Sequence, residues 1–275
     1  MNSDERLLDY REVTIANRMT GEHIVHGFTA SLRRGEVLGI VGESGSGKSI
    51  TCRSILGILP RGFDITEGTA EVLGQDLRNL SAKGWLSIRG VRVGAVFQDP
   101  GSYLNPSIRV GPQIAEPLRV RRGLKRGEAK ERVLDLFASV HLADPADLYQ
   151  RYSYELSGGM LQRILIAGAL ALEPEVLIAD EATTALDVTV QAEILDLLEE
   201  LKEKTGVALV VVSHDLAVVG RLCDRILVMR HGQIIDQGST RQVLFEPAHE
   251  YTRLLVSEHQ VYGLDRFLAA ERSAG

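Results

Sequence analysis

Residues 37–49 read VLGIVGESGSGKS, and this stretch decides the fold expected for the chain. Its first five residues are a short apolar run of the kind that forms a buried strand. Gly42–Ser49 then match the pattern GxxxxGK[ST], and Lys48–Leu56 continue as a helix. A strand, a glycine-rich loop and a helix in this order form the context in which that pattern binds the phosphates of a nucleotide. A glycine-rich turn without a ligand is the alternative.

The glycine loop has the chemistry needed to hold a nucleoside triphosphate. Its glycines allow backbone N–H groups to turn toward the phosphates, and the N-terminus of the following helix adds a partial positive charge. Lys48 can reach the β- and γ-phosphates, and the Ser49 hydroxyl is a candidate Mg²⁺ ligand. The loop therefore predicts ATP or GTP together with Mg²⁺. The residues expected to contact the nucleotide here are Gly42, Glu43, Ser44, Gly45, Ser46, Gly47, Lys48, Ser49 and Ile50.

Short β-rich runs alternate with helical stretches along the chain, which predicts an α/β fold with a parallel sheet. Residues 6–34 alternate apolar and polar positions, so we expect antiparallel strands there, at one edge. Residues 105–155 are helical in pattern and are interpreted as an inserted helical subdomain. Their basic run RVRRGLKRG (119–127) is interpreted as a solvated corner rather than a functional patch. Further strands are expected at 91–97, 176–179, 207–212 and 225–229, and helices at about 158–172, 189–204 and 214–222.

Two carboxylates stand at the end of a predicted buried strand, where residues 176–181 read VLIADE. Parallel strands bring their carboxyl ends to one edge of a sheet, where open α/β sheets bind ligands. We therefore expect Asp180 to hold Mg²⁺, through a bound water, and Glu181 to polarise the attacking water as general base. Acidic residues that cap the next helix are the alternative.

Two further polar side chains end predicted strands. His214 lies in VVSHD (211–215), where it could hydrogen-bond the γ-phosphate and hold a water in line. Gln98 ends GAVFQ (94–98), and its amide can touch both Mg²⁺ and that water. Each residue alone is a weak signal, and its functional interpretation depends on the other motifs.

Residues 155–163 read ELSGGMLQR, so a serine and two glycines open a second apolar helix. Backbone N–H groups at a helix N-terminus form an anion site that has no anion of its own. The chain thus carries two phosphate-binding elements more than a hundred residues apart.

The ordered set GESGSGKS, Gln98, LSGGMLQR, VLIADE, ALD (185–187) and His214 resembles the ATP-binding subunit of ABC transporters over nearly the whole chain. This resemblance implies a P-loop NTPase (RecA-like) core with a parallel sheet, an N-terminal antiparallel β subdomain and an inserted α-helical subdomain. It implies a single nucleotide-binding domain over 1–275, divided into a core of 1–98 and 158–250, a helical subdomain of 99–157 and a helical tail of 251–275.

The resemblance also implies a head-to-tail dimer and ATP hydrolysis. Ser157, Gly158 and Gly159 of one subunit would close over ATP held by the phosphate loop of the other, with Gln162 and Arg163 supporting that surface and Asp187 at the contact. The catalytic residues implied are Glu181, His214, Gln98 and Lys48. A homologous second ATP-binding subunit is the expected partner, and a homodimer is the alternative.

Three stretches resemble the branch that serves importers of oligopeptides, dipeptides and nickel. They are QDPGSYLNP (98–106), DEATTALDVTVQAEIL (180–195) and PAHEYTRLL (247–255). The resemblance implies that Gln98 and the helical insert contact a permease, so the partners are two transmembrane permease subunits and, indirectly, an extracytoplasmic substrate-binding protein.

The chain departs from the family pattern at three places. VTIANRM (13–19) offers no aromatic to stack on adenine, and Ala182 stands where many relatives have proline. The final segment has no cysteine for an iron–sulfur cluster, which together with LGILP (56–60) favours the nickel or metal-chelate type. His249 and His259 are interpreted as surface residues rather than metal sensors.

The composition of the chain indicates which partners and which cellular location to expect. The chain has 275 residues, 44% of them hydrophobic and 25% charged, and its net charge of −6 disfavours a nucleic-acid partner. Cys52 and Cys223 lie far apart, which fits a reducing cytosol rather than a disulfide framework. No apolar run is long enough to cross a bilayer. We therefore expect a peripheral location at the cytoplasmic face of the inner or plasma membrane.

Two other classes compete with an importer subunit. One is an accessory ABC subunit of a phosphonate-degrading complex, whose sequence resembles the same branch, although QDPGSYLNP favours a transporter. The other is a non-transport ABC protein that acts on nucleic acid or ribosomes, which the short insert, the single cassette and the negative charge disfavour.

Overall fold

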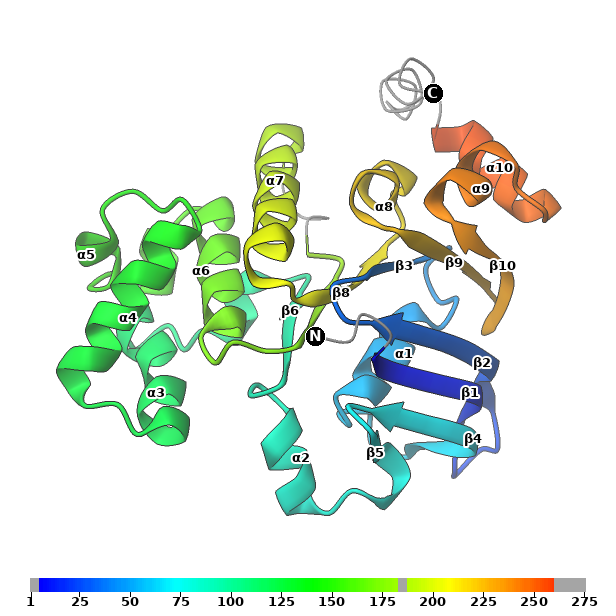
Figure 1. Cartoon of the computed structure of the whole chain (residues 1–275), viewed down its shortest axis with the longest axis horizontal. Coiled ribbons are helices and arrows are strands. Elements are labelled where there is room, and N and C mark those ends of the chain that lie inside the picture. The colour runs from blue at the N-terminus through cyan, green and yellow to red at the C-terminus, as the bar shows by residue number, and fades with distance from the viewer. Residues whose placement is uncertain (1–4, 183–186, 260–275) are drawn as a thin grey trace. The chain divides into compact units, whose positions relative to one another are not determined.

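The computed structural model describes residues 5–182 and 187–259. They fall into two compact units, which are described separately. The first unit contains the residues up to 85 and from 206 onward, and the second contains residues 86–205. Figure 1 labels the elements of both.

The first unit contains an antiparallel sheet in the order β2-β1-β4-β5. Residues 6–34 therefore form the antiparallel strands that the sequence predicts. The apolar residues of β1, among them Tyr10 and Ile15, are buried, and because consecutive residues are buried at 7–8 and 13–16, both faces of the strand are covered there. The bounds are β1 Arg6–Asn17, β2 His23–Arg33, β4 Phe63–Val72 and β5 Gln75–Asp76.

The same unit contains a second set of strands in the order β10-β9-β3-β8. Strands β9, β3 and β8 are parallel, and β10 runs antiparallel to β9. Every residue of β3 and β8 is buried, as expected of apolar strands in a parallel sheet. Val41 is level with Ser213 on one side and Val228 on the other, so the carboxyl ends of three strands meet at one edge. The bounds are β3 Val37–Val41, β8 Ala208–Ser213, β9 Arg225–Arg230 and β10 Gln233–Ser239.

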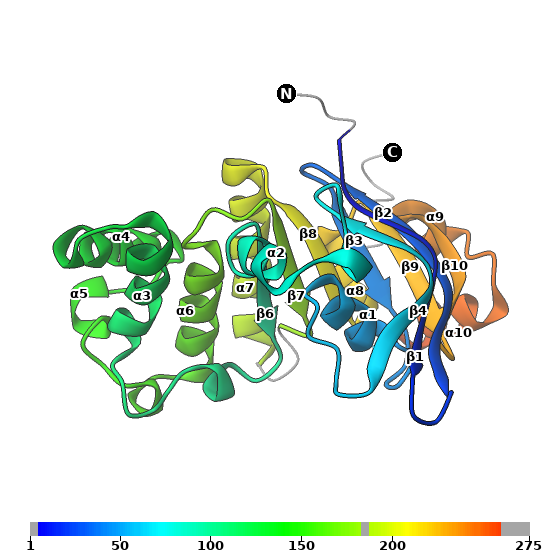
Figure 2. The same ribbon diagram turned by 90° about the horizontal axis from the view of Figure 1, so that it is seen from below.

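Helices α1, α8, α9 and α10 accompany these strands (Figures 1 and 2). Helix α1 packs against β4, and the Tyr10 hydroxyl forms a 3.0 Å hydrogen bond with Ser54 that ties α1 to β1. Helix α8 packs on β3 and β8, α9 lies on β10, and α10 contacts α8. The bounds are α1 Lys48–Ile55, α8 Leu216–Leu222, α9 Thr240–Phe245 and α10 Glu250–His259, while α2 covers Ala82–Ile88.

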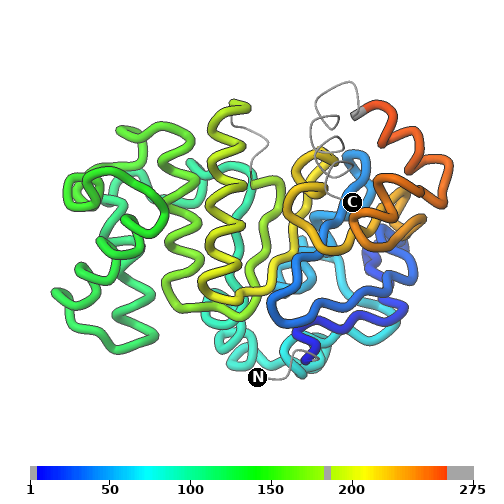
Figure 3. Tube along the Cα trace, turned by 45° about the horizontal axis from the view of Figure 1, so that its top comes forward, coloured from blue at the N-terminus to red at the C-terminus, as the bar shows by residue number. Residues whose placement is uncertain are grey.

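The second unit combines two parallel strands with a group of helices. Strand β6 (Val93–Phe97) pairs with β7 (Val176–Asp180), and Phe97 is level with Asp180. Helices α3, α4 and α6 contact one another and run side by side in Figure 3. The helix bounds are α3 Val110–Arg122, α4 Arg126–Ser139, α5 Pro145–Leu148, α6 Gly158–Leu170 and α7 Val188–Thr205.

The basic run 119–127 has a local structural explanation. Its first arginines lie in the last turn of α3, where positive charge is favourable beside the helix C-terminus. Gly123 then ends the helix in the left-handed conformation. The Arg122 guanidinium donates to the Leu172 carbonyl at 2.7 Å.

The predicted α/β class with parallel strands, an antiparallel N-terminal sheet and helices within 105–155 is confirmed. Strands β4 and β10 are not among the predicted elements. Their residues are only partly buried, and Gly68 and Gly238 interrupt the apolar alternation, which explains the weak sequence signal. The division into core, helical subdomain and tail stays a prediction. Among the described residues, no helix has the length and apolar character needed to span a membrane.

Candidate functional site

The glycine loop connects β3 to α1 as the sequence predicts. Gly42, Gly45 and Gly47 have φ angles of 149°, 80° and 100°, values that residues other than glycine rarely adopt. A Cβ at Gly42 would lie 2.0 Å from the Met229 carbonyl oxygen, whereas one at Gly45 would meet nothing within 4 Å. The loop is thus held closely at its start and open at Gly45.

Lys48 is buried at the first turn of α1. Its ammonium group donates to the Gly42 and Glu43 carbonyl oxygens, each at 2.7 Å. The Glu43 carbonyl also accepts from the Ser46 N–H at 3.2 Å. The lysine therefore lies along the inner side of the loop, at the position from which an ammonium group can move to phosphate oxygens.

His214 follows the strand residue Ser213, which is level with Val41 at the start of the loop. The two predicted site elements of the first unit therefore leave the same edge of the parallel sheet. The His214 side chain is exposed, and the next residue, Asp215, begins α8 by accepting a 2.8 Å hydrogen bond from the Ala217 N–H. This places an imidazole at the edge where ligands bind in such sheets.

The second unit brings together the other three predicted residues that follow strands. Because Phe97 and Asp180 are level, Gln98 and Glu181 leave adjacent strand ends. Asp180 is buried, Glu181 is half-buried and Gln98 is exposed, so the site is open to solvent on one side.

Glu181 has a φ of 50°, in the left-handed region that is unfavourable for a glutamate. Glu173 in the same unit has a similar φ of 56°, so this conformation by itself does not mark a functional residue. No sequence pattern marks the conformation, which only the structure reveals.

Ser157, Gly158 and Gly159 form the start of α6. The Ser157 side chain caps the helix by accepting from the Met160 N–H at 3.3 Å, and Ser157 and Gly158 are exposed. A Cβ at Gly159 would lie 2.7 Å from a methyl group of Val190, so this end of α6 packs on the start of α7. The N-terminus of α6 is therefore exposed at Ser157 and Gly158, and the contact between Gly159 and Val190 of α7 holds it in place.

Arg163, in the same LSGGMLQR motif, ties the first turns of α6 to neighbouring elements. Arg163 donates to the Val140 carbonyl at 2.9 Å and to the Glu193 carboxylate on α7 at 2.8 Å. Gln162 is buried, and its Nε2 has no hydrogen-bond partner among the described residues. Asp187 accepts from the Val190 N–H at 3.0 Å and so caps α7, while positions 185 and 186 of ALD lie outside the described residues.

The predicted Mg²⁺ ligands are Ser49, Gln98 and Asp180. A hydroxyl, an amide oxygen and a carboxylate are the hard oxygen donors that Mg²⁺ prefers. Within the described residues, no group of three or more His, Cys, Asp or Glu side chains forms a metal cluster.

At the end of the first strand, where an adenine-stacking aromatic is not found in the sequence, two histidines of β2 lie nearby. Ala16 pairs with His23 across β1 and β2, and the His23 and His26 rings lie 5.7 Å apart. His249 has a structural contact, because its Nδ1 accepts from the Tyr251 N–H at 3.0 Å. His259 ends α10, and the tail beyond it lies outside the described residues.

Sequence reasoning missed Tyr251 among the residues that touch the loop. Tyr251, on α10, accepts a 3.2 Å hydrogen bond from the Glu43 N–H. The two residues are 208 positions apart, so no local pattern could reveal the contact.

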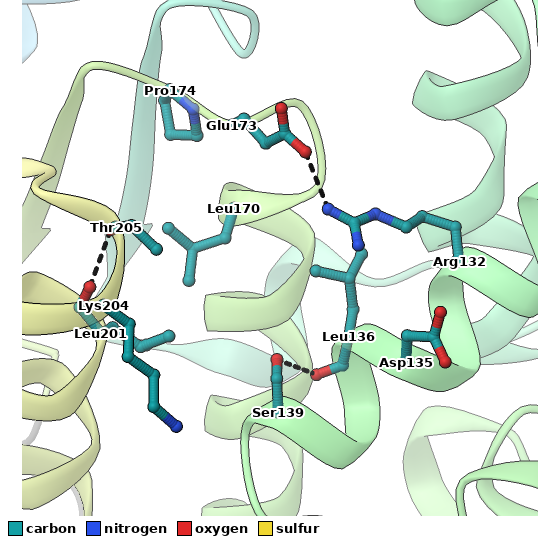
Figure 4. Close-up of a pocket in the computed structure, with 10 residues that line it drawn as sticks. All are labelled: Arg132, Asp135, Leu136, Ser139, Leu170, Glu173, Pro174, Leu201, Lys204 and Thr205. Atoms are coloured by element: carbon teal, nitrogen blue, oxygen red, sulfur yellow. Dashed lines mark hydrogen bonds and ion pairs between the residues drawn. The ribbon is translucent and has the colours of Figure 1, made fainter.

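A cavity of about 440 Å³ in the second unit contains none of the predicted site residues (Figure 4). Leu136 of α4, Leu170 of α6 and Leu201 of α7 line it. The Arg132–Glu173 ion pair, at 2.8 Å, lies at one side of it (Figure 4). The candidate nucleotide site and this cavity are therefore different places.

A scan for known families matches the ABC transporter family over residues 25–184. The chain is 41% identical to the probable D,D-dipeptide transport ATP-binding protein DdpD of Escherichia coli, over 90% of this chain and 75% of that protein. It is also 41% identical to the oligopeptide transport ATP-binding protein OppD of Bacillus subtilis, over 90% of this chain and 70% of that protein.

Solved structures agree with these relatives. CbiO1 from Clostridium perfringens, part of the ABC transporter complex CbiONQ, has a TM-score of 0.78 at 29% identity and covers 98% of this chain and all of its own. A dimeric structure of the ATP-binding cassette MJ0796 with ADP and phosphate has a TM-score of 0.75 at 28% identity, over 85% of this chain and 99% of that one.

The fold and the ordered motifs thus define an ATP-binding cassette, a P-loop ATPase. The chain belongs to the ABC transporter family. ATP binding and ATP hydrolysis follow from that membership. The roles of the individual residues stay predictions.

Proposed function

We propose that this chain is the ATP-hydrolysing subunit of an importer whose cargo is a peptide. One observation supports the catalytic part most directly. In each unit, the predicted site residues leave the carboxyl ends of adjacent parallel strands, with Val41 level with Ser213 and Phe97 level with Asp180. In the first unit, His214 follows a strand parallel to the one that leads into the glycine loop and its buried lysine, and polar residues at strand ends beside such a loop suit phosphoryl transfer.

In this proposal, the loop amides and Lys48 hold the β- and γ-phosphates of ATP. Glu181 accepts a proton from the attacking water, while His214 and Gln98 orient that water. Ser49, Gln98 and Asp180 would hold Mg²⁺, which would supply positive charge to offset that of the phosphates.

The second part of the proposal is a dimer in which Ser157–Gly159 of one subunit face the loop of the other. The exposed start of α6 and Asp187 lie together, because Gly159 packs on Val190 and Val190 donates to Asp187. Val188, between them, is 84% exposed and so is available for contact with another chain. The MJ0796 cassette was solved as a dimer with ADP and phosphate, which supports a dimer for this chain.

The partners and location extend this proposal. Two permease subunits would receive the motion of the dimer at the cytoplasmic face of the membrane, and an extracytoplasmic binding protein would supply the cargo. The dipeptide and oligopeptide relatives support a peptide cargo. Nickel or a metal chelate stays the alternative that the LGILP stretch favours.

Replacing Glu181 with glutamine tests the proposal. The variant should bind ATP, because the amide preserves the shape of the side chain. Its kcat should fall by about a hundredfold or more, the contribution typical of a general base. With ATP it should accumulate as a dimer, with itself or with its cognate subunit, measurable by light scattering.

Glu173→Gln is the matched control. Glu173 is also a glutamate with positive φ in the second unit, at 56°, but its carboxylate pairs with Arg132. This variant should retain its kcat. Normal hydrolysis by the Glu181→Gln variant would contradict the assignment of the base.

A further inference from the structure

Tyr251 connects the phosphate loop to the start of α10. The Tyr251 hydroxyl accepts from the Glu43 N–H at 3.2 Å, and Tyr251 is only 3% exposed. Glu43 is the second residue of the loop, and its carbonyl accepts from the Lys48 ammonium at 2.7 Å. One loop residue therefore connects the α10 hydroxyl to the lysine expected to hold the phosphates.

Tyr251 is itself held in place from several directions. The Arg230 guanidinium lies over its ring, 4.5 Å from the centroid, at the end of β9. The Tyr251 N–H donates to His249 Nδ1 at 3.0 Å, and the His249 N–H donates to the buried Asp236 carboxylate of β10 at 3.0 Å. The first turn of α10 is thus fixed to β9 and β10, so the hydroxyl has a fixed position.

The Tyr251 hydroxyl stays protonated around neutral pH. Burial raises the pKa of Tyr251 to about 12, and the Glu43 carboxylate contributes by favouring the protonated hydroxyl. A raised pKa means that the neutral phenol is the form present in the folded protein around neutral pH, and its oxygen accepts the Glu43 N–H in that form.

We propose that Tyr251 is a positioning residue for ATP: it fixes the Glu43 peptide unit and thereby pre-organises the phosphate loop. This inference rests on the proposed function of the loop. Tyr251 does not touch the phosphates, so its effect reaches the nucleotide only through Glu43 and Lys48. Removing the hydroxyl leaves the loop to be ordered by ATP itself, at a cost in affinity.

Replacing Tyr251 with phenylalanine removes the hydroxyl and keeps the buried ring. The Kd of a fluorescent ATP analogue, and the KM for ATP, should rise by about three- to tenfold, the range expected for one lost hydrogen bond. The kcat at saturating ATP should change less than twofold, because no group at the reacting atoms is altered. The difference from wild type should be constant between pH 6 and pH 9.

Thr252→Val is the matched control in the same turn. Thr252 is fully buried, and its hydroxyl has no hydrogen-bond partner among the described residues. Valine has the same shape, so the Kd for ATP should stay at the wild-type value. A rise equal to that of Tyr251→Phe would show a general disturbance of α10 and would overturn the proposal.

Lys48→Ala separates this inference from the proposed function. If Lys48→Ala loses ATP binding while Tyr251→Phe binds like wild type, the tyrosine has no positioning role and the ATP site stands. If Lys48→Ala binds ATP normally, the proposed site fails. A Tyr251→Phe variant that loses kcat and thermal stability together, with unchanged KM, would assign Tyr251 to folding alone and would also overturn the proposal.

Discussion

At the scale of single residues, the glycines of the phosphate loop have different tasks. Gly42 lies against the main chain of β9, since a Cβ there would be 2.0 Å from the Met229 carbonyl oxygen. Gly47, which precedes α1, is close to β2, where a Cβ would be 3.2 Å from a methyl group of Val25. Gly45 has open space around it. The motif therefore combines two positions needed for packing with one needed only for its backbone conformation.

Alanine substitutions should separate these tasks. Gly45→Ala adds only the conformational cost of a positive φ, about 1–2 kcal/mol of unfolding free energy. Gly42→Ala has that strain and must also displace β9 or the loop, and overpacking typically adds about 1–3 kcal/mol. Chemical unfolding without nucleotide should therefore show Gly42→Ala as the less stable variant. Equal unfolding free energies would contradict the close contact with Met229.

At the scale of elements, the N-termini of α6 and α7 lie together in the second unit, and each is capped by a side chain. Ser157 caps α6, Asp187 caps α7, and Gly159 brings the two ends together by packing on Val190. The resemblance to ABC cassettes assigns Asp187 to the subunit contact, and the structure adds a second role within the subunit. A residue with both roles should affect stability even in the isolated chain.

The Asp187 cap can be tested by comparing two substitutions. Asp187→Ala should lose about 1 kcal/mol of unfolding free energy, the usual value of an N-cap. That corresponds to a fall in Tm of about 2–4 °C for a domain of this size. Asp187→Asn should keep most of the stability, because its amide oxygen can accept the same hydrogen bond. Thermal unfolding followed by circular dichroism measures both, and an equal loss in the two variants would exclude the cap.

The sequence predicts some elements closely and others poorly, for physical reasons. The fully buried strand β3 is predicted to the residue, because its apolar run is bounded by charge and glycine. Strand β4 is missed because few of its residues are buried and Gly68 interrupts the alternation of apolar and polar residues. At the site, motif spacing predicts which residues end the strands, since that is local information. The strained φ of Glu181 and the Tyr251–Glu43 contact depend on tertiary structure and cannot be read from a local pattern.

At the scale of the whole molecule, the two phosphate-binding elements have a simple consequence in a symmetric dimer. In a two-fold dimer, a contact between surface i and surface j occurs twice, once in each direction. Each proposed ATP site then contains the loop of one subunit and Ser157–Gly159 of the other. A damaged loop and a damaged α6 start on different chains would leave one of the two sites intact.

A mixing experiment tests this arrangement. Lys48→Ala removes the phosphate-holding ammonium, and Ser157→Arg places a bulky side chain on the exposed start of α6. Each variant alone should have little ATPase activity. If the chain pairs with itself, random mixing makes half of the dimers mixed, and one of two sites works in each, so about a quarter of wild-type activity should return.

If the chain instead pairs with a related subunit, the prediction takes a different form. Ser157→Arg should then leave ATP binding by this chain's own loop unchanged and abolish hydrolysis of the nucleotide held by the partner. A site built within one subunit gives the opposite pattern, because each damaged chain would be inactive by itself and mixing could restore nothing. If Ser157→Arg abolished ATP binding by the same chain, and if mixing it with Lys48→Ala restored no ATPase activity, the shared site would be contradicted. Recovery would show that the helix start of α6 acts on a nucleotide bound by another molecule.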